Sequence, residues 1–301
     1  LLNKINMSST TKGIILAAGK GTRLMPATLP APKPLLPLYD KPMIYYPLEA
    51  LIRMGIKDIL FIVQQDDLST FQNTFGSGEH VGLNFSYEIQ KIQRGIADAY
   101  FIAENFLQKS PSVLALSDNV FLGKNYFEYA NQAMDKMKNV GGSVFGLPVP
   151  DPEKFGVIEF DSNDKIIGIE EKPKNPKSNL IIPGMYFLDS EAPLHAKTLK
   201  PSPRGELEIT DLIQIYLQNN KLDLQKLDAS IIWHDTGNAE ALLSASLKVK
   251  QYEIDNNLKL GSYEIAAYEN KFIGIDDLEK IANKFDKSDY GQSIKKYLKH
   301  L

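Results

Sequence analysis

The sequence has no cysteine, and none of its apolar runs approaches the length that a membrane-spanning helix needs. Without cysteine, this chain of 301 residues has no disulfide, no thiolate metal ligand and no cysteine nucleophile. A membrane helix takes roughly 18 consecutive apolar residues. The opening residues also lack the apolar core and small-residue cleavage site of a secretory signal. We therefore expect a cytoplasmic protein with no membrane association.

Charge of one sign is not in excess, and histidine is rare. The chain has 34 lysines and arginines against 37 acidic residues, a net charge of −3. Such a balance argues against a nucleic-acid-binding surface, which gathers basic residues on one face. The four histidines have no metal-ligand spacing. A small phosphate-bearing ligand remains compatible, because its site needs only a few focused cations.

The first half of the sequence alternates short apolar runs with segments of helical spacing. The apolar runs predict strands over 13–17, 58–63 and 112–116, and the helical spacing predicts helices over 42–54, 96–107 and 125–137. This alternation is typical of an α/β protein with a mostly parallel sheet and flanking helices. Ligands in such sheets gather beyond the carboxyl ends of the strands.

After about residue 141 the pattern changes to strands with few helices between them. Strands are predicted over 143–149, 156–160, 165–170, 181–188 and 229–233, and helices over 191–199, 209–218, 239–252, 276–285 and 292–301. We expect one domain over residues 11–250, divided at about residue 140, and a helical C-terminal segment over 251–301. Residues 1–10 are expected to be a disordered extension.

A glycine-rich loop directly follows the first predicted strand. Gly19 and Gly21 allow the backbone to approach a ligand closely, so that successive N–H groups can face phosphate oxygens. The dinucleotide-binding fingerprint needs a third glycine where Leu24 stands. The P-loop string is absent from the sequence as well. A plain tight turn stays open as the alternative for these glycines.

Two cations strengthen the phosphate interpretation. Arg23 lies in the loop itself, and Lys33 follows in a proline-rich segment, Pro30–Pro37. Arginine can bind two phosphate oxygens at once, while lysine acts as a compact charge. Because prolines restrict the segment between them, the two cations are partly held in place. Together they favour a triphosphate site over a solvated loop.

These motifs resemble the sugar-1-phosphate nucleotidylyltransferase family. The resemblance begins with Gly-x-Gly-Thr-Arg-Leu and the proline-rich segment, and the string Asp40–Pro47 is especially similar to the thymidylyl branch. Further motifs follow in the family's order over almost the whole chain, at 116–119, 170–173, 184–186, 203–211 and 233–237. The resemblance implies the nucleotide-diphospho-sugar transferase fold, with a Rossmann-like mixed sheet. It also implies a nucleotide side over 11–140 and a sugar-binding subregion over 141–228.

The resemblance also implies roles for individual residues. Arg23 and Lys33 would stabilise the phosphates during transfer. The residues implied to bind the nucleotide are Leu16, Gly19, Gly21, Thr22, Gln90, Gly95 and Asp118. The residues implied to bind the sugar phosphate are Gly156, Glu171, Lys172, Tyr186 and Arg204. Asp118 and Asp235 each follow an apolar strand, so the two carboxylates can converge on Mg²⁺, which prefers oxygen ligands.

The implied reaction is transfer of a nucleotidyl group from dTTP to glucose 1-phosphate, giving dTDP-glucose and pyrophosphate. It would be the first step of dTDP-rhamnose or related deoxysugar synthesis, in a homo-oligomer that the family predicts to be a tetramer. Ala18, Arg94, Phe155 and Pro183 depart from the family's usual residues and leave the base and sugar open. The alternatives are uridylyl transfer from UTP and a non-catalytic nucleotide-sugar-binding regulator. A nicotinamide-dependent oxidoreductase is disfavoured by Leu24.

Overall fold

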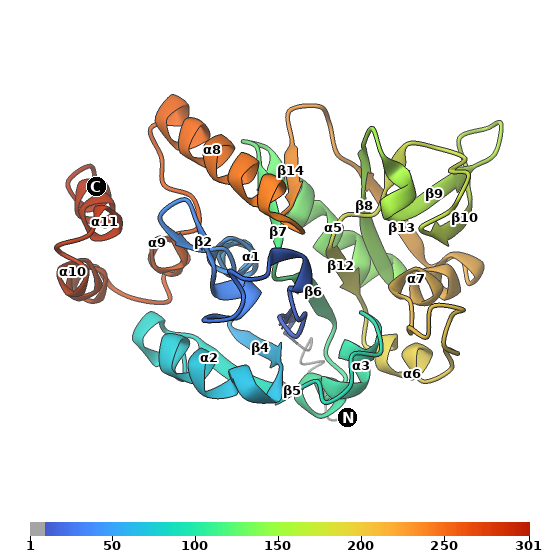
Figure 1. The fold of residues 1–301 in the computed structure, drawn as a ribbon, viewed down its shortest axis with the longest axis horizontal. Coiled ribbons are helices and arrows are strands. Elements are labelled where there is room, and N and C mark those ends of the chain that lie inside the picture. Colours follow the sequence, from blue (N-terminus) through green and yellow to red (C-terminus); the bar gives the residue numbers. More distant parts are fainter. Residues whose placement is uncertain (1–9) are drawn as a thin grey trace, which may run out of the picture.

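Four parallel strands form the centre of the structure, a computed structural model that describes residues 10–301 (Figure 1). In order across the sheet they are β5 (Asn84–Ile89), β4 (Asp58–Val63), β1 (Lys12–Leu16) and β6 (Ser112–Leu116). Neighbouring side chains on a strand point to opposite faces, and Ile14 and Ile15 of β1 are both fully buried. Burial on both faces is expected for parallel strands between two layers of helices. The strands predicted over 13–17, 58–63 and 112–116 are confirmed.

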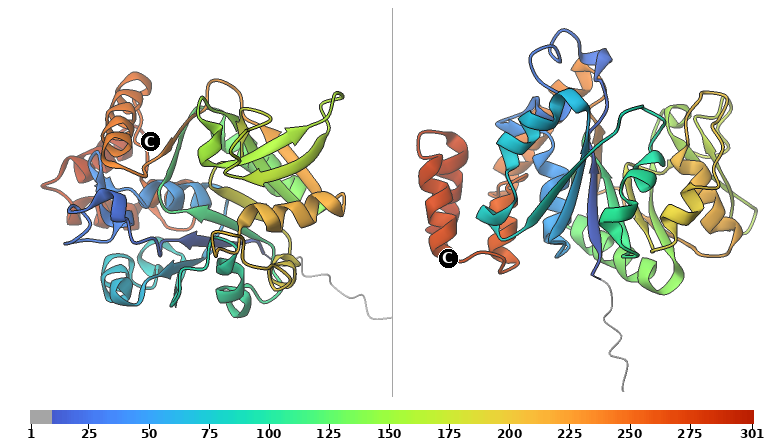
Figure 2. Two further views of the ribbon diagram at one scale, coloured as in Figure 1. Left: turned by 45° about the vertical axis from the view of Figure 1, so that its right-hand side comes forward. Right: turned by 90° about the horizontal axis from the view of Figure 1, so that it is seen from below.

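Each face of the sheet carries its own apolar core and its own helices. Ile15 belongs to the core that is covered by α1 (Tyr45–Arg53), α2 (Leu68–Phe75) and α5 (Tyr126–Val140). Ile14 belongs to the opposite core, covered by α3 (Asp98–Ile102), α4 (Glu104–Leu107), α6 (Ala192–Ala196) and α7 (Ile209–Gln218). The right-hand view of Figure 2 shows the helices on both sides of the strands. The predicted α/β class, with a mainly parallel sheet and flanking helices, is confirmed.

The sheet continues beyond β6 with strands from the second half of the chain. Within residues 10–301 it reaches ten strands, of which β12 (Met185–Leu188) pairs antiparallel with β6. The further strands are β8 (Gly142–Pro148), β9 (Gly156–Phe160), β10 (Ile166–Glu171), β11 (Leu180–Ile181) and β13 (Leu222–Lys226). The β9–β10 hairpin lies at the upper right of Figure 1, far from the C-terminal helices.

Two small sheets and several short helices complete the main body. The two small sheets pair β7 (Asn119–Leu122) with β14 (Ile232–Asp235) and β2 (Pro37–Leu38) with β3 (Lys41–Pro42). The 3₁₀ helices are η1 (Thr22–Leu24), η2 (Lys33–Leu35), η3 (Gln65–Asp67), η4 (Glu79–Val81) and η5 (Pro152–Lys154). The long helix α8 (Ala239–Asn256) packs against both small sheets.

Several predicted elements have other bounds in the structure, and three of these differences have a local backbone cause. The helix predicted over 42–54 begins at Tyr45, since the Met43 N–H donates to the Leu36 carbonyl. The helix predicted over 96–107 begins at Asp98, since the Ala97 N–H donates to the Leu207 carbonyl, and it is divided into α3 and α4 at Ala103. The strand predicted over 181–188 is interrupted at Pro183, which has no N–H to donate.

The C-terminal segment consists of short helices that pack beside α1. These are α9 (Tyr263–Glu269), α10 (Ile275–Lys284) and α11 (Asp289–Leu298). Helix α9 packs on α1, and its residues share the core of Ile15. None of the helices in residues 10–301 has both the length and the apolar content to cross a membrane. The boundaries at 140 and 250 stay predictions, and the predicted extension over 1–10 lies, apart from Thr10, outside the described residues.

Candidate active site

The glycine-rich loop joins β1 to η1 at the carboxyl end of the central strand. Gly21 has a φ of 61°, in the region that favours glycine, and a Cβ there would lie 2.8 Å from Cβ of Lys33. Within residues 10–301, and apart from the two chain neighbours, no heavy atom lies within 4 Å of the place where Gly19 would carry a Cβ, so this part of the loop is open. A cavity of about 500 Å³ lies against the loop. Its lining includes the predicted site residues Leu16, Gly19, Gly21, Thr22, Arg23, Lys33 and Asp118.

Lys33 stands at the start of η2, where its flanking prolines restrict the backbone. The residue is 8 % exposed, and its ammonium group is paired with the carboxylate of Asp118. Asp118 follows β6, and β6 lies next to β1 in the sheet. The structure therefore brings the two residues together at one edge of the sheet, although they are far apart in the sequence.

Asp235 reaches the same place through the pairing of β14 with β7. In that ladder Asp235 stands opposite Asn119, and the Thr236 N–H donates to the Asp118 carbonyl at 3.1 Å. The pKa of the Asp235 carboxyl is raised, first by burial and then by the negative charge of Asp118. The nearby cations Lys33, Arg23 and Lys172 oppose that rise. Two carboxylates therefore share one partly buried site.

Arg23 lines the same cavity as Asp118. A Cβ at Gly237 would be 3.2 Å from its guanidinium nitrogens, so the glycine leaves room for the arginine. Among residues 10–301 there is no group of three or more histidine or acidic side chains that could hold a metal. A pair of carboxylates suits Mg²⁺, which usually keeps several waters and takes its remaining ligands from substrate phosphates.

Three of the five predicted sugar-phosphate residues, Glu171, Lys172 and Arg204, line a second cavity of about 800 Å³. Glu171 ends β10, and its carboxylate accepts a hydrogen bond from the Thr210 hydroxyl at 3.2 Å. Its pKa is raised, mainly by burial, while the adjacent Lys172 ammonium lowers it. A side chain at Gly156 would meet Thr210 at 2.5 Å, so a residue larger than glycine would not fit there.

Arg204 lines this second cavity, whereas Tyr186 is not among its lining residues. The Arg204 guanidinium lies 3.4 Å from Glu171 and 3.1 Å from Glu206, so it is held among carboxylates. Tyr186 is a buried residue of β12. Burial raises the pKa of its hydroxyl, and the negative charges of Glu171 and Asp118 raise it further. Tyr186 thus lies within electrostatic reach of both halves of the site.

Gln90 and Gly95 lie at the far end of the nucleotide side. The Gln90 N–H donates to the carbonyl of Val63, the last residue of β4, so Gln90 stands at the same edge of the sheet as the glycine-rich loop. Gly95 has a φ of 103°, and a Cβ there would lie 2.5 Å from the Leu207 carbonyl oxygen. Only glycine fits this contact without moving the backbone.

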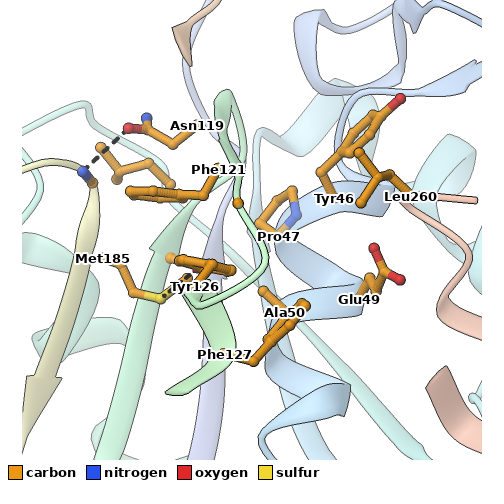
Figure 3. Close-up of a pocket in the computed structure, with 14 residues that line it drawn as sticks. Tyr46, Pro47, Glu49, Ala50, Asn119, Phe121, Tyr126, Phe127, Met185 and Leu260 are labelled. Atoms are coloured by element: carbon orange, nitrogen blue, oxygen red, sulfur yellow. Dashed lines mark hydrogen bonds between the residues drawn. The ribbon is translucent and has the colours of Figure 1, made fainter. Parts of the chain in front are cut away.

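Asn119 and Gln93 are site residues that the sequence prediction missed. The Asn119 amide donates to Asp118 at 3.0 Å, and its oxygen accepts from the indole N–H of Trp233 at 2.7 Å. The same oxygen accepts from the Gly184 N–H at 3.1 Å (Figure 3). It therefore links the strands that carry Asp118, Asp235 and the sugar side. In the sequence, the position of Asn119 directly after Asp118 was the one indication of a role in the site. Gln93 donates to the Ala18 carbonyl and lines the nucleotide cavity, with no motif to mark it.

A family profile described as nucleotidyl transferase matches residues 12–252. Glucose-1-phosphate thymidylyltransferase from Neisseria gonorrhoeae is 44% identical over 290 residues, which cover 96% of this chain and 99% of the relative. The enzyme of that name from Mycolicibacterium smegmatis is 41% identical over 94% of this chain and 97% of its own length. The chain therefore belongs to the nucleotidyl transferase family and is an enzyme of that class. Within the family it groups with the glucose-1-phosphate thymidylyltransferases.

Solved structures agree with this placement. A crystal structure from Bacillus anthracis, described as a candidate glucose-1-phosphate thymidylyltransferase in complex with sucrose, is 35% identical with a TM-score of 0.74. The match covers 85% of this chain and 99% of the Bacillus anthracis chain. A UDP-glucose pyrophosphorylase complexed with UDP-glucose gives a TM-score of 0.70 at 24% identity, over 80% of this chain and 98% of that one, and supports the fold alone. The predicted family, fold and enzyme class are confirmed, and the roles of the individual residues stay predictions.

Proposed function

We propose that the protein transfers a thymidylyl group from dTTP to glucose 1-phosphate, giving dTDP-glucose and pyrophosphate. The observation that carries this proposal is the convergence of two cations and two carboxylates, Arg23, Lys33, Asp118 and Asp235, beside the open glycine-rich loop. The relatives that match almost the whole chain are named for this activity. The product would enter deoxysugar synthesis, for which dTDP-rhamnose is our expectation.

The reaction is a direct displacement at phosphorus. A phosphate oxygen of glucose 1-phosphate forms a bond to the α-phosphorus of dTTP, and the bond from that phosphorus to the bridging oxygen of pyrophosphate breaks. The attacking oxygen is already an anion, so no general base is required. The protein's contribution is positioning and stabilisation of negative charge. Lys33 and Arg23 supply that stabilisation at the loop.

Asp118 and Asp235 would hold Mg²⁺, since both carboxylates reach the same site and Asp118 acts electrostatically on Asp235. When bound, the ion would offset the charge of the phosphates and hold their oxygens in place. Lys33 pairs with Asp118 in the present structure, and a bound triphosphate would offer Lys33 a second anionic partner. We expect pyrophosphate release to stop when Mg²⁺ is removed by EDTA and to return when the ion is restored.

On the sugar side, Glu171 is placed to accept hydrogen bonds from sugar hydroxyls, because its carboxylate borders the second cavity. Lys172 and Arg204 line the same cavity and would bind the phosphate of the sugar substrate. Gly156, opposite Glu171 in the β9–β10 ladder, leaves the space that Thr210 fills beside the Glu171 carboxylate. A second copy of the chain is expected in solution, and a tetramer is our prediction from the family.

The test is pyrophosphate release with glucose 1-phosphate and Mg²⁺, supplying dTTP, UTP, CTP, ATP and GTP in parallel. We expect the highest kcat/KM with dTTP. A preference for UTP would preserve the mechanism and assign the enzyme to uridylyl transfer. Release of no pyrophosphate from any of the five nucleotides would contradict the proposal.

A further inference from the structure

The amide of Gln90 is held in one orientation by groups inside the protein. Its nitrogen Nε2 donates to Asp98 at 3.0 Å and lies 3.4 Å from the Gly95 carbonyl oxygen. An amide nitrogen carries two hydrogens, so both have acceptors within the protein. No residue among 10–301 donates a hydrogen bond to the oxygen Oε1, and this atom is not buried away from solvent. The free group that Gln90 offers to a ligand is therefore an acceptor.

Asp98 is the residue that imposes this orientation. It stands at the first turn of α3, is 1 % exposed, and accepts from Gln90 through Oδ2 and from the Arg94 guanidinium through Oδ1 at 2.6 Å. An ionised carboxylate has no hydrogen to donate. If the Gln90 amide turned over, Oε1 would face the carboxylate and two acceptors would meet in a buried place, which is costly.

We infer that Asp98 sets the base selectivity of the enzyme, by fixing Gln90 as an acceptor for a ring N–H of the nucleotide. This inference rests on the proposed function and names the feature of the substrate that is recognised. Gln90 lies two strands from the glycine-rich loop along the same sheet edge, and Gln93 of its own loop touches the Ala18 carbonyl. A nucleotide with its phosphates at the loop can therefore place its base beside Gln90.

The hydrogen-bonding pattern of the bases then decides which of them is accepted. Thymine and uracil carry a hydrogen on N3, which Oε1 of Gln90 can accept. Cytosine has a lone pair on N3, so it would set two acceptors against each other. A mismatched polar pair in such a site costs about 10- to 100-fold in affinity. Guanine also has a ring N–H, so the selection is against cytosine and adenine. Arg94 supports the carboxylate from the side that is open to solvent.

The experiment compares kcat/KM for dTTP and dCTP in the wild-type enzyme and in the Asp98→Asn variant, with glucose 1-phosphate and Mg²⁺. Asparagine keeps the shape of the side chain and can face Gln90 with either its oxygen or its nitrogen. We expect the ratio of dTTP to dCTP to fall about 10- to 100-fold in the variant. A loss of stability alone would lower both rates and leave that ratio unchanged.

Two further variants complete the test. Asp98→Glu keeps a carboxylate beside the amide and is expected to restore the ratio to within about threefold of the wild-type value, an energy difference of roughly 0.7 kcal/mol. Asp276→Asn makes the same chemical change in the first turn of α10, at an exposed residue, and is expected to leave the ratio unchanged. An unchanged ratio in Asp98→Asn, with the wild type preferring dTTP, would overturn the inference. Inactivity of the wild type with all pyrimidine nucleotides would instead overturn the proposed function.

A measurement on the wild type keeps the inference testable if Asp98→Asn does not fold. The side-chain amide hydrogens of Gln90, assigned in a ¹H–¹⁵N spectrum by comparison with Gln90→Leu, should exchange slowly with solvent, because both have protein acceptors. Gln251 serves as a matched reference, since its amide donates to Asp255 at an exposed position. Exchange of the Gln90 hydrogens as fast as those of Gln251 would contradict the inference.

Discussion

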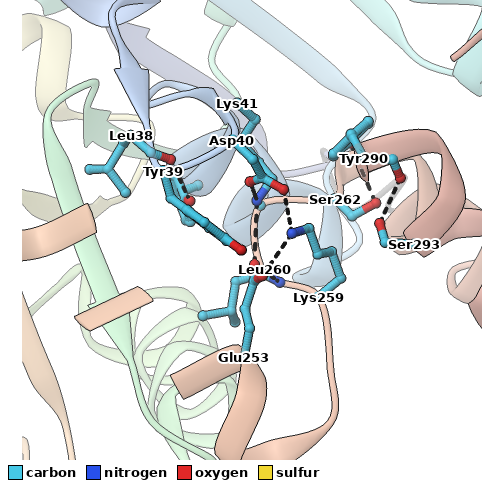
Figure 4. A network of polar contacts seen from close by, with 12 residues as sticks. Leu38, Tyr39, Asp40, Lys41, Glu253, Lys259, Leu260, Ser262, Tyr290 and Ser293 are labelled. Carbon is cyan, nitrogen blue, oxygen red and sulfur yellow. Dashed lines mark hydrogen bonds and ion pairs between the residues drawn. The ribbon is translucent and has the colours of Figure 1, made fainter. Parts of the chain in front are cut away.

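Two buried lysines that lie close together in the sequence, Lys33 and Lys41, have different surroundings. Both are paired with acids, and they are 8 % and 3 % exposed. Lys33 lines the nucleotide cavity, so a phosphate can compete for its charge. Lys41 is enclosed by Asp40 and Glu253 (Figure 4). The rings of Tyr46 and Tyr290 lie within 6 Å of its ammonium group. Burial and pairing are common to both lysines, and what distinguishes Lys33 is its opening toward a cavity.

The largest expected effect concerns the open lysine. Lys33→Ala should lower kcat for pyrophosphate release by about 10²- to 10³-fold, because one strong electrostatic contact to the reacting phosphates is lost. Its melting temperature should stay within a few degrees of that of the wild type. Lys287→Ala removes an exposed lysine between α10 and α11 and is the control. Wild-type turnover by Lys33→Ala would show that Lys33 does not stabilise the reacting phosphates.

Lys41, the enclosed lysine, should contribute to the stability of the fold rather than to turnover. Lys41→Ala leaves the buried carboxylate of Glu253 with Lys259 as its remaining cation, and we expect a loss of about 3 kcal/mol in the free energy of unfolding. Urea denaturation of both variants measures this. At a temperature where Lys41→Ala is folded, its kcat should be near the wild-type value. A loss of kcat as large as that of Lys33→Ala would contradict the structural role.

A pH experiment tests the pKa of the buried Glu264 carboxyl, which lies near Lys41. Burial raises the pKa of Glu264, in α9 near Lys41, from 4.5 to about 7, while a hydrogen bond from the Tyr290 hydroxyl opposes the rise. The folded state therefore holds a proton that the unfolded state releases, and stability decreases as the pH rises from about 4.5 to 7. The contribution at stake is about 3 kcal/mol.

The measurement is the free energy of unfolding of Glu264→Gln minus that of the wild type, followed across the same pH range. Glutamine does not titrate, so this difference should rise by about 3 kcal/mol between pH 4.5 and 7.5. Glu279→Gln changes an exposed residue of α10 and should give a flat difference. A flat difference for Glu264→Gln would mean that the buried carboxyl has an ordinary pKa.

The smallest effect is expected on the sugar side, where the Lys172–Glu171 pair also opens toward a cavity. Glu171→Gln keeps the size of the side chain and removes its charge, so we expect KM for glucose 1-phosphate to rise about tenfold, the equivalent of a hydrogen bond to a charged group. KM for dTTP should change less. Glu153→Gln, at an exposed residue of η5, is the control. An equal rise in both KM values would argue against a sugar-specific role.

The parts of the fold that could be predicted from the sequence are those with strong local patterns. The strands at 58–63 and 112–116 are continuous apolar runs, and the loop that holds Gly19 and Gly21 follows such a run directly. Asp118 and Asp235 each follow an apolar run, and strand ends are where such a sheet gathers its ligands, so their convergence could be predicted as well. The resemblance supplied the metal-binding role that is predicted for the pair.

The features that escaped prediction depend on contacts between distant segments. The start of α3 at Asp98 depends on a backbone hydrogen bond between Ala97 and Leu207. The role of Asn119 as a link between three strands depends on Gly184 and Trp233. Neither contact leaves a periodic or compositional trace, since each is made by one residue with a partner far away in the chain.

We propose that the cluster around Lys33 and Asp118 transfers the thymidylyl group of dTTP to glucose 1-phosphate, with release of pyrophosphate. A ³¹P NMR time course of the wild-type enzyme with dTTP, glucose 1-phosphate and Mg²⁺ tests this reaction. We expect equal growth of a sugar-linked diphosphate and of pyrophosphate, with loss of both substrates in equal amounts. Pyrophosphate accompanied by dTMP, or unchanged substrate signals with a folded enzyme, would contradict it.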